Sequence, residues 1–383
     1  MKLKYGCNPH QKANLTFAGN SPLQILNGCP GYINILDALS AWQLVKEMKR
    51  STGIASATSF KHVSPAGAAI AKPLDDNFIK SQFIPEGNYS KIATAYIRAR
   101  SCDRVSSYGD AIAVSEKVDI SLANYIKAQV SDLIIAPEYE IEALEILKSK
   151  KNGKYLILKI NKDYDAPNIE KRTIFGFSLQ QETNNIQINE TFFKKNLPNK
   201  NIANDALLNL IIGNIVLKHT ISNSVVIVYD GMTIGIGAGQ QSRIQSTRIA
   251  CNKADNWFLS RHPKVLNLKF KKELNKTNKI NIINQFLNCK EKIIKERYIL
   301  KNFTKSPESI TLKERISWNK KFDNIALCSD AFIPFRDNID RASYTNVKYI
   351  SHEGGSIRDE KVRKAAQENK IMIIRTGVRL FRH

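Results

Sequence analysis

The sequence is poor in the features that mark membrane, metal-binding and disulfide-stabilised proteins. No run of 18 or more apolar residues occurs among its 383 residues, which excludes a transmembrane helix. The N-terminal segment MKLKYGCNPHQ lacks the apolar core of a signal peptide, so we expect a cytoplasmic chain with no membrane partner. The six cysteines form no CxxC pair, which argues against a zinc site and a disulfide framework.

Acidic residues are also scarce: 35 Asp and Glu accompany 58 Lys and Arg, a net charge of +23. Such an excess is typical of nucleic-acid binding, but also of Lys-, Ile- and Asn-rich compositions with solvated basic faces. Residues 264–305 hold 12 basic and 3 acidic residues, and their apolar positions follow helical spacing at Ile282, Phe286, Cys289 and Ile293. No RRM, KH or zinc-finger motif accompanies this segment, so we expect no nucleic-acid partner.

Apolar residues make up 43% of the chain, which is enough for an ordinary core. Strand-like runs alternate with helical patterns, and this alternation predicts an α/β protein. We expect buried strands at 53–60, 133–136, 155–160, 225–229 and 371–374. We expect amphipathic helices at 38–49, 140–150 and 204–218.

A loose internal repeat points to two related α/β units. Residues 103–110 and 330–337 each have Asp at both ends and an aromatic residue at the sixth position. Each is followed by a segment that reads as strand, loop, helix and strand. We therefore predict one unit over 1–200 and a second over 201–261 and 328–383, with a helical insert at 262–327.

Lys61 and His62 are adjacent at the end of an apolar strand, just before the turn SPAG. A lysine and a neutral histidine at one site can stabilise an oxyanion and move a proton near pH 7. The alternative is a basic pair on the surface at a strand end.

Residues 235–243, GIGAGQQSR, predict a glycine-rich turn that leads into a helix. Such a turn can bind an anion at the helix start, or it can be only a tight connection. Its GxGxG spacing is neither the GxGxxG dinucleotide fingerprint nor a Walker loop. The segments PFRDN and RLFRH each combine aromatic and basic residues. Their arginines could bind phosphate or carboxylate. The alternative is that PFRDN is a salt-bridged loop and RLFRH a frayed tail.

Taken together, several long motifs resemble AICAR transformylase, the formyltransferase half of the bifunctional purine-biosynthesis family that also holds IMP cyclohydrolase. The resemblance spans nearly the whole chain and runs through NPHQ, LNGCPGYINILDALSAWQLVKE, SFKHVSPAGAA, SCDRVSSYGDAIA, VSDLIIAP, SNSV, IGIGAGQQSRIQSTR, SDAFIPFRDNIDRA and RLF. It implies duplicated cytidine-deaminase-like α/β/α units, the second carrying a helical insert. The deaminase zinc signature is absent, so no zinc is implied.

The resemblance also implies a reaction, the transfer of a formyl group from 10-formyltetrahydrofolate to the 5-amino group of AICAR. His62 matches the group that accepts the amine proton, and Lys61 matches the group that stabilises the transition state. Asn223 matches the amide that orients the reacting groups. The family acts as a homodimer with active sites shared across the interface.

Further ligand contacts carry over by position. The residues implied for AICAR are Lys4, Tyr5, Gly109, Asp132, Arg243, Phe332 and Arg379, and those implied for folate are Ile244, Asp337, Ser356 and Ile357. Three residues depart from the family pattern. Lys4 replaces the usual Arg, which bears on phosphate affinity. Gly377 and Arg382 replace the usual Asn and His, which bears on a monovalent-cation site near the C-terminus.

Met1 falls where the transformylase half of the family begins. We therefore expect a monofunctional transformylase without the cyclohydrolase domain, and a separate IMP cyclohydrolase as the partner activity. The alternative from another class is a degenerate, non-catalytic folate- or nucleotide-binding protein.

Overall fold

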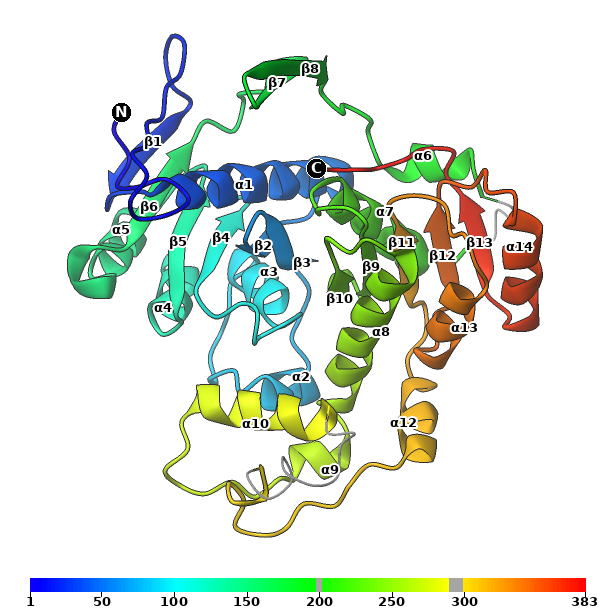
Figure 1. Cartoon of the computed structure of the whole chain (residues 1–383). Coiled ribbons are helices and arrows are strands. Elements are labelled where there is room, and N and C mark those ends of the chain that lie inside the picture. Colours follow the sequence, from blue (N-terminus) through cyan, green and yellow to red (C-terminus); the bar gives the residue numbers. More distant parts are fainter. Residues whose placement is uncertain (198–201, 289–298) are drawn as a thin grey trace.

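The computed structural model describes residues 1–197, 202–288 and 299–383 (Figure 1). In these residues, one mixed sheet has the order β1-β6-β5-β4-β2-β3-β10-β9-β11-β12-β13. Its strands are β1 (Leu23–Asn27), β2 (Ser56–Lys61), β3 (Ser64–Ile70), β4 (Asp110–Val114), β5 (Ser131–Ala136), β6 (Leu156–Ile160), β9 (Val225–Tyr229), β10 (Met232–Gly237), β11 (Ala326–Ser329), β12 (Tyr349–His352) and β13 (Met372–Arg375). A separate hairpin consists of β7 (Ile169–Ile174) and β8 (Phe177–Glu182).

The helices lie between the strands along the chain and differ widely in length. They are α1 (Tyr32–Thr52), α2 (Asp76–Ser81), α3 (Lys91–Arg100), α4 (Ile120–Lys127), α5 (Ile141–Lys148), the 3-10 turn η1 (Lys150–Gly153), α6 (Glu190–Lys194), α7 (Asn204–Lys218), α8 (Arg243–Leu259), α9 (Pro263–Leu266), α10 (Lys276–Asn288), α12 (Leu312–Asn319), α13 (Asp337–Tyr344) and α14 (Asp359–Glu368). No helix in the described part of the chain is long and apolar enough to cross a membrane.

The sheet has the same pairing pattern on both sides of its centre, where β3 and β10 pair antiparallel. Outward from β3, the strands β2, β4, β5 and β6 pair antiparallel, antiparallel, parallel and parallel. Outward from β10, the strands β9, β11, β12 and β13 pair in the same sequence. The α/β class is therefore confirmed, whereas the cytidine-deaminase-like assignment and the unit boundaries stay predictions.

Apolar side chains bury both faces of the sheet, giving three layers (Figure 1). Helices α1 and α7 cover one face, where residues such as Leu44 and Ile212 are fully buried. Helices α3, α4, α5, α8, α13 and α14 contribute to the core on the other face. The two faces have separate cores, so each side chain of a central strand is committed to one layer.

The strongest sequence patterns predicted the elements best. The strand at 225–229 and the helix at 204–218 have the predicted bounds. The strand predicted at 53–60 begins only at Ser56, because Gly53 adopts φ +70° and ends α1.

The predicted internal repeat agrees with the structure in its strand–loop–helix–strand segments and differs from it in the two Asp-bounded segments. The segments β5–α5–β6 and β12–α14–β13 match in element order, as the repeat predicts. In each segment the two strands also pair parallel. The two Asp-bounded segments do not correspond, because 103–110 ends at the start of strand β4 whereas 330–337 follows β11 and ends at the start of helix α13.

The predicted insert at 262–327 contains α9, α10 and α12 and supplies most residues of two small apolar clusters, one of which also includes Leu259 of α8. Ile282 is buried in one of them and Phe286 packs against both, as their helical spacing predicts. The other two positions of that pattern, 289 and 293, lie outside the described residues.

Candidate active site

One edge of the sheet gathers most of the residues singled out by sequence. Register places the end of β2 beside the starts of β3 and β4, since Lys61 pairs with Ser64 and Phe60 with Ala111. The start of β9 lies beside the ends of β10 and β11 at the same edge, where Val225 pairs with Gly237 and with Ser329. A hydrogen bond of 3.3 Å from the Ile221 amide to Ser64 Oγ joins the two halves.

The Lys61–His62 pair lies on a two-residue hairpin between β2 and β3. His62 and Val63 form the whole turn, and both have positive φ, 53° and 59°. Turns of this kind favour Asn-Gly, because other side chains are strained there. His62 is exposed, and Lys61 Nζ donates to the Tyr108 carbonyl at 2.6 Å.

Lys61 thereby lies next to two predicted AICAR contacts. Gly109 follows Tyr108, and its amide donates to the Val130 carbonyl at 3.0 Å. A Cβ on Gly109 would lie 3.9 Å from Asp132 Oδ2, so the two residues are neighbours. The Asp132 carboxylate pairs with Lys151 at 2.8 Å in an exposed bridge.

Beneath this loop lies a buried network that sequence reasoning did not identify. Arg100 donates to the Ser107 carbonyl at 2.6 Å and to Asp110 at 2.7 Å. Ser59 Oγ donates to the other oxygen of Asp110 at 2.6 Å. Arg100, a charged residue on the largely buried helix α3, is the signal that could have revealed it. The network fixes the loop whose Tyr108 carbonyl accepts the hydrogen bond from Lys61.

In the second half, Asn223, Arg243 and Asp330 form one cluster. Arg243 donates to Asn223 Oδ1 at 2.7 Å and to the Asp330 carboxylate. Asn223 Nδ2 donates to the Gln240 carbonyl at 2.9 Å, so both ends of its amide have partners. Burial lowers the pKa of Arg243 from its ordinary value, although Asp330 opposes that effect.

The glycine-rich turn is shorter than predicted. Gly235 and Gly237 lie inside β10, and only the residues after Gly237 form the turn before α8. A Cβ on either glycine would meet a carbonyl oxygen of α8 at 2.0 or 2.1 Å. These two glycines therefore allow α8 to pack closely on β10, and no ligand is needed to explain them. Arg243 and Ile244, both predicted contacts, begin α8.

The basic C-terminal tail is docked at the same edge, which excludes the frayed-tail alternative. The Leu380 amide donates to the Asp330 carbonyl at 2.8 Å. Arg382 donates to Ser40 Oγ of α1 at 2.9 Å and lies 3.3 Å from His219 Nδ1. Just before these anchors in the chain, Arg379 is exposed and stacks over Phe381 at 4.8 Å.

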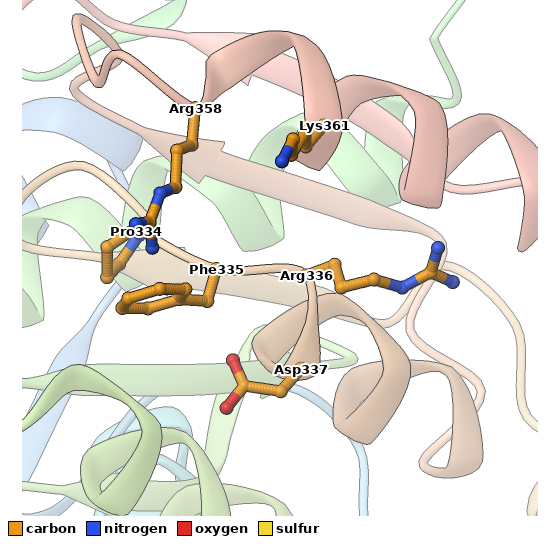
Figure 2. A pocket seen from close by; sticks show the side chains of 6 residues that line it. All are labelled: Pro334, Phe335, Arg336, Asp337, Arg358 and Lys361. Carbon is orange, nitrogen blue, oxygen red and sulfur yellow. The ribbon is translucent and has the colours of Figure 1, made fainter.

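Three of the predicted folate contacts lie at or beside a surface pocket of about 390 Å³ (Figure 2). Asp337 lines the pocket, together with Arg358 and Phe335. The Arg358 guanidinium lies 4.3 Å from the Phe335 ring centroid. Ser356 and Ile357 precede Arg358 in the chain, and Ile357 is fully exposed. The predicted AICAR contact Phe332 is half-exposed on the segment that leads into the pocket.

Lys4 and Tyr5 belong to the N-terminal segment, which packs against the start of α1. The Tyr32 amide donates to the Tyr5 carbonyl at 3.0 Å, and a Cβ on Gly31 would touch the Tyr5 ring at 2.8 Å. Lys4 Nζ lies 5.7 Å from the centre of the Tyr5 ring. In the part of the chain that the structure describes, no hydrogen bond or ion pair joins these two residues to the Lys61–His62 hairpin.

No cluster of three or more His, Cys, Asp or Glu able to hold a metal ion occurs in the described residues. Near the C-terminus, Gly377 has φ +68°, a conformation that favours glycine. The monovalent-cation site there stays a prediction.

A model of the AICARFT/IMPCHase bienzyme family matches residues 1–253. The chain belongs to this family. Two curated relatives, each called bifunctional purine biosynthesis protein PurH, come from Roseobacter denitrificans and Bacillus cytotoxicus. Each is 29% identical over the whole of this chain, across 388 and 391 aligned residues. The chain spans 59% of the length of either relative.

Proposed function

We propose that this protein is an enzyme of purine biosynthesis that transfers a formyl group from 10-formyltetrahydrofolate to the 5-amino group of AICAR. The observation that carries the proposal is the Lys61–His62 hairpin at the sheet edge, joined to the Asn223 loop by the bond between Ile221 and Ser64. An acid–base pair and an orienting amide, far apart in sequence, thus share one edge of the sheet.

The reaction sets two demands. The amine of AICAR is conjugated with its ring and is a poor nucleophile, so it must lose a proton as it attacks. Negative charge also builds on the formyl oxygen and must be stabilised. An exposed histidine can accept the proton, and a lysine ammonium can stabilise the oxyanion and protonate the folate nitrogen that leaves.

We assign these roles to His62 as base and Lys61 as electrophile and proton donor. Among the described residues, the Lys61 ammonium has one hydrogen bond, to the Tyr108 carbonyl, and this bond uses only one of its three N–H donors. Asn223 orients the formyl and amine groups once substrate replaces its present partner, the Gln240 carbonyl.

For the 5′-phosphate of AICAR we propose Arg379 as the main contact. Its guanidinium is exposed and stacked on Phe381, which leaves its N–H groups available to a bidentate oxyanion. Arg243 is buried and already bonded to Asp330 and Asn223, so it acts chiefly by holding Asn223.

For folate we propose the pocket of Asp337 and Phe335 (Figure 2). A pterin presents N–H donors that a carboxylate accepts, and the aromatic ring offers a stacking surface. Arg358 and Lys361 also line the pocket and suit the carboxylates of the folate tail.

We further propose a homodimer in which the β7–β8 hairpin contacts the second copy. Both faces of this hairpin are exposed, although it carries large apolar residues. Such exposure is unusual for a monomer and typical of an interface. The side chains concerned are Ile169, Ile174, Phe175, Phe177 and Leu179. A Phe175→Asp, Phe177→Asp double variant should sediment as a monomer, and an unchanged dimer would contradict this assignment.

The test is a formyl-transfer assay with purified protein, AICAR and 10-formyltetrahydrofolate, which follows the appearance of tetrahydrofolate. It should be run with and without added IMP cyclohydrolase, because ring closure draws the transfer forward. We expect turnover in both arms and more complete conversion in the second. Binding of both ligands without turnover would instead support the non-catalytic alternative, against which Lys61, His62 and Asn223 all count.

A further inference from the structure

The turn that carries His62 is strained and needs support from outside itself. Residues His62 and Val63 both have left-handed backbone conformations. For a β-branched residue such as Val63 this is a rare and strained conformation. A hairpin of this sequence would relax to another turn unless the surrounding structure prevented it.

The support comes from Asp37, a residue of α1 that lies 26 positions away in the sequence. Asp37 Oδ1 accepts the Val63 amide at 2.6 Å, the short distance expected of a charged acceptor. The His62 amide and ring also face this carboxylate, and Asp132 is the further charged group that acts on it. Burial raises the pKa of Asp37 above its ordinary value.

Helix α1 makes Asp37 a rigid anchor. The side chain is only 8% exposed, and its helix neighbours Ala38 and Ala41 are completely buried against the sheet. A carboxylate placed in an apolar helix face is disfavoured unless a specific bond compensates for it. The bond to the turn is that compensation.

We infer that Asp37 is a positioning residue that holds the Lys61–His62 turn in its left-handed conformation, and with it the direction of both side chains. The inference rests on the proposed formyl-transfer function for its consequence in activity. Asp37 does not act on substrate directly; it acts through the backbone of the turn.

The decisive variants change Asp37 and Val63 separately and together. Asp37→Ala removes the acceptor and should lower kcat about 100-fold, as small misplacements of catalytic groups do, while both KM values change little. Asp37→Asn keeps an acceptor oxygen and should retain most of the activity. In the Asp37→Ala background, Val63→Gly should restore kcat at least about tenfold, because glycine adopts positive φ without strain.

The rescue separates positioning from a general loss of stability. A glycine in the turn cannot repair a core damaged near α1, so rescue of kcat supports positioning. Asp119→Ala is the matched control, since Asp119 also accepts a backbone amide, that of Leu122 at 2.8 Å, but at the start of α4. It should leave kcat unchanged.

Hydrogen exchange gives a readout that is independent of catalysis. The Val63 amide should exchange faster in Asp37→Ala than in the wild type and in Asp37→Asn. Unchanged exchange in Asp37→Ala, or an Asp37→Ala kcat equal to that of the wild type, would overturn the inference. If the wild-type protein transfers no formyl group, the proposed function fails, and the exchange measurement still decides whether Asp37 holds the turn.

Discussion

Arg243 donates to the carboxylate of Asp330, and both side chains are buried, with 6% and 0% of their surfaces exposed. Asp330 also accepts the amide and hydroxyl of Ser224 at 2.8 and 2.9 Å. The pair therefore binds the start of α8 to the end of β11 at the candidate site. The buried guanidinium of Arg243, with its fixed partners, therefore serves mainly to hold the elements of the site together.

Replacing Arg243 should therefore damage stability as well as activity. Arg243→Met leaves the Asp330 carboxylate buried without its cation, which should lower the free energy of unfolding by about 3–5 kcal/mol. Arg379→Met removes an exposed side chain, so it should raise the KM for AICAR with little loss of stability. Urea denaturation and steady-state kinetics check both. Equal stability of the two variants would contradict this division of roles.

Gly237→Ala should destabilise the protein more than an ordinary glycine substitution. The added Cβ would lie 2.1 Å from the Ser246 carbonyl oxygen, so α8 must move away from β10. We expect the free energy of unfolding to fall by about 3 kcal/mol, which is at the upper end of the range for overpacked cores. Gly239→Ala is the comparison, because φ is +66° there but the nearest atom is 3.9 Å away. The free energy of unfolding of Gly239→Ala should fall by about 1–2 kcal/mol, from backbone strain alone. Thermal unfolding measures the difference.

Stability should fall as the pH drops below about 6.5, partly because of His352. Burial lowers the pKa of His352 to about 4, and the side chain is 2% exposed. Between these pH values the unfolded chain binds the proton and the folded chain does not, so the free energy of unfolding decreases by up to about 3 kcal/mol. His352→Gln should flatten this part of the pH–stability curve; an unchanged slope would count against the assignment.

Arg382→Ala should loosen the C-terminal tail and so weaken AICAR binding. The substitution removes the bonds to Ser40 and His219 that anchor the tail beyond Arg379. We expect a rise of about tenfold in KM for AICAR, corresponding to about 1.4 kcal/mol, with a smaller change in the KM for folate. Arg363→Ala, which removes only an exposed bridge to Glu360, is the control. A normal KM in Arg382→Ala would show that the tail is held by other contacts.

Periodicity predicted the elements whose environment is uniform along their length. Helix α7 is buried nearly all round and β9 on both faces, so their sequences are continuous apolar runs with clear ends. The β7–β8 hairpin was not predicted, because its residues are exposed on both faces and show no buried stripe. The glycines of β10 were assigned to a turn, since their real reason, the close approach of α8, lies in another element.

The chemistry of the candidate site divides in the same way. By itself the sequence determined the family motifs, the adjacency of Lys61 and His62 at a strand end, and the lysine-rich stretch at 264–305, because these are properties of neighbouring residues. Only the tertiary structure decided that Asp37 supports the turn of His62, that Asp330 binds Arg243, and that Arg379 stays exposed. Those relationships depend on which distant groups are buried together, and a buried charge takes the partner that the packing of helices and sheet brings within hydrogen-bond distance.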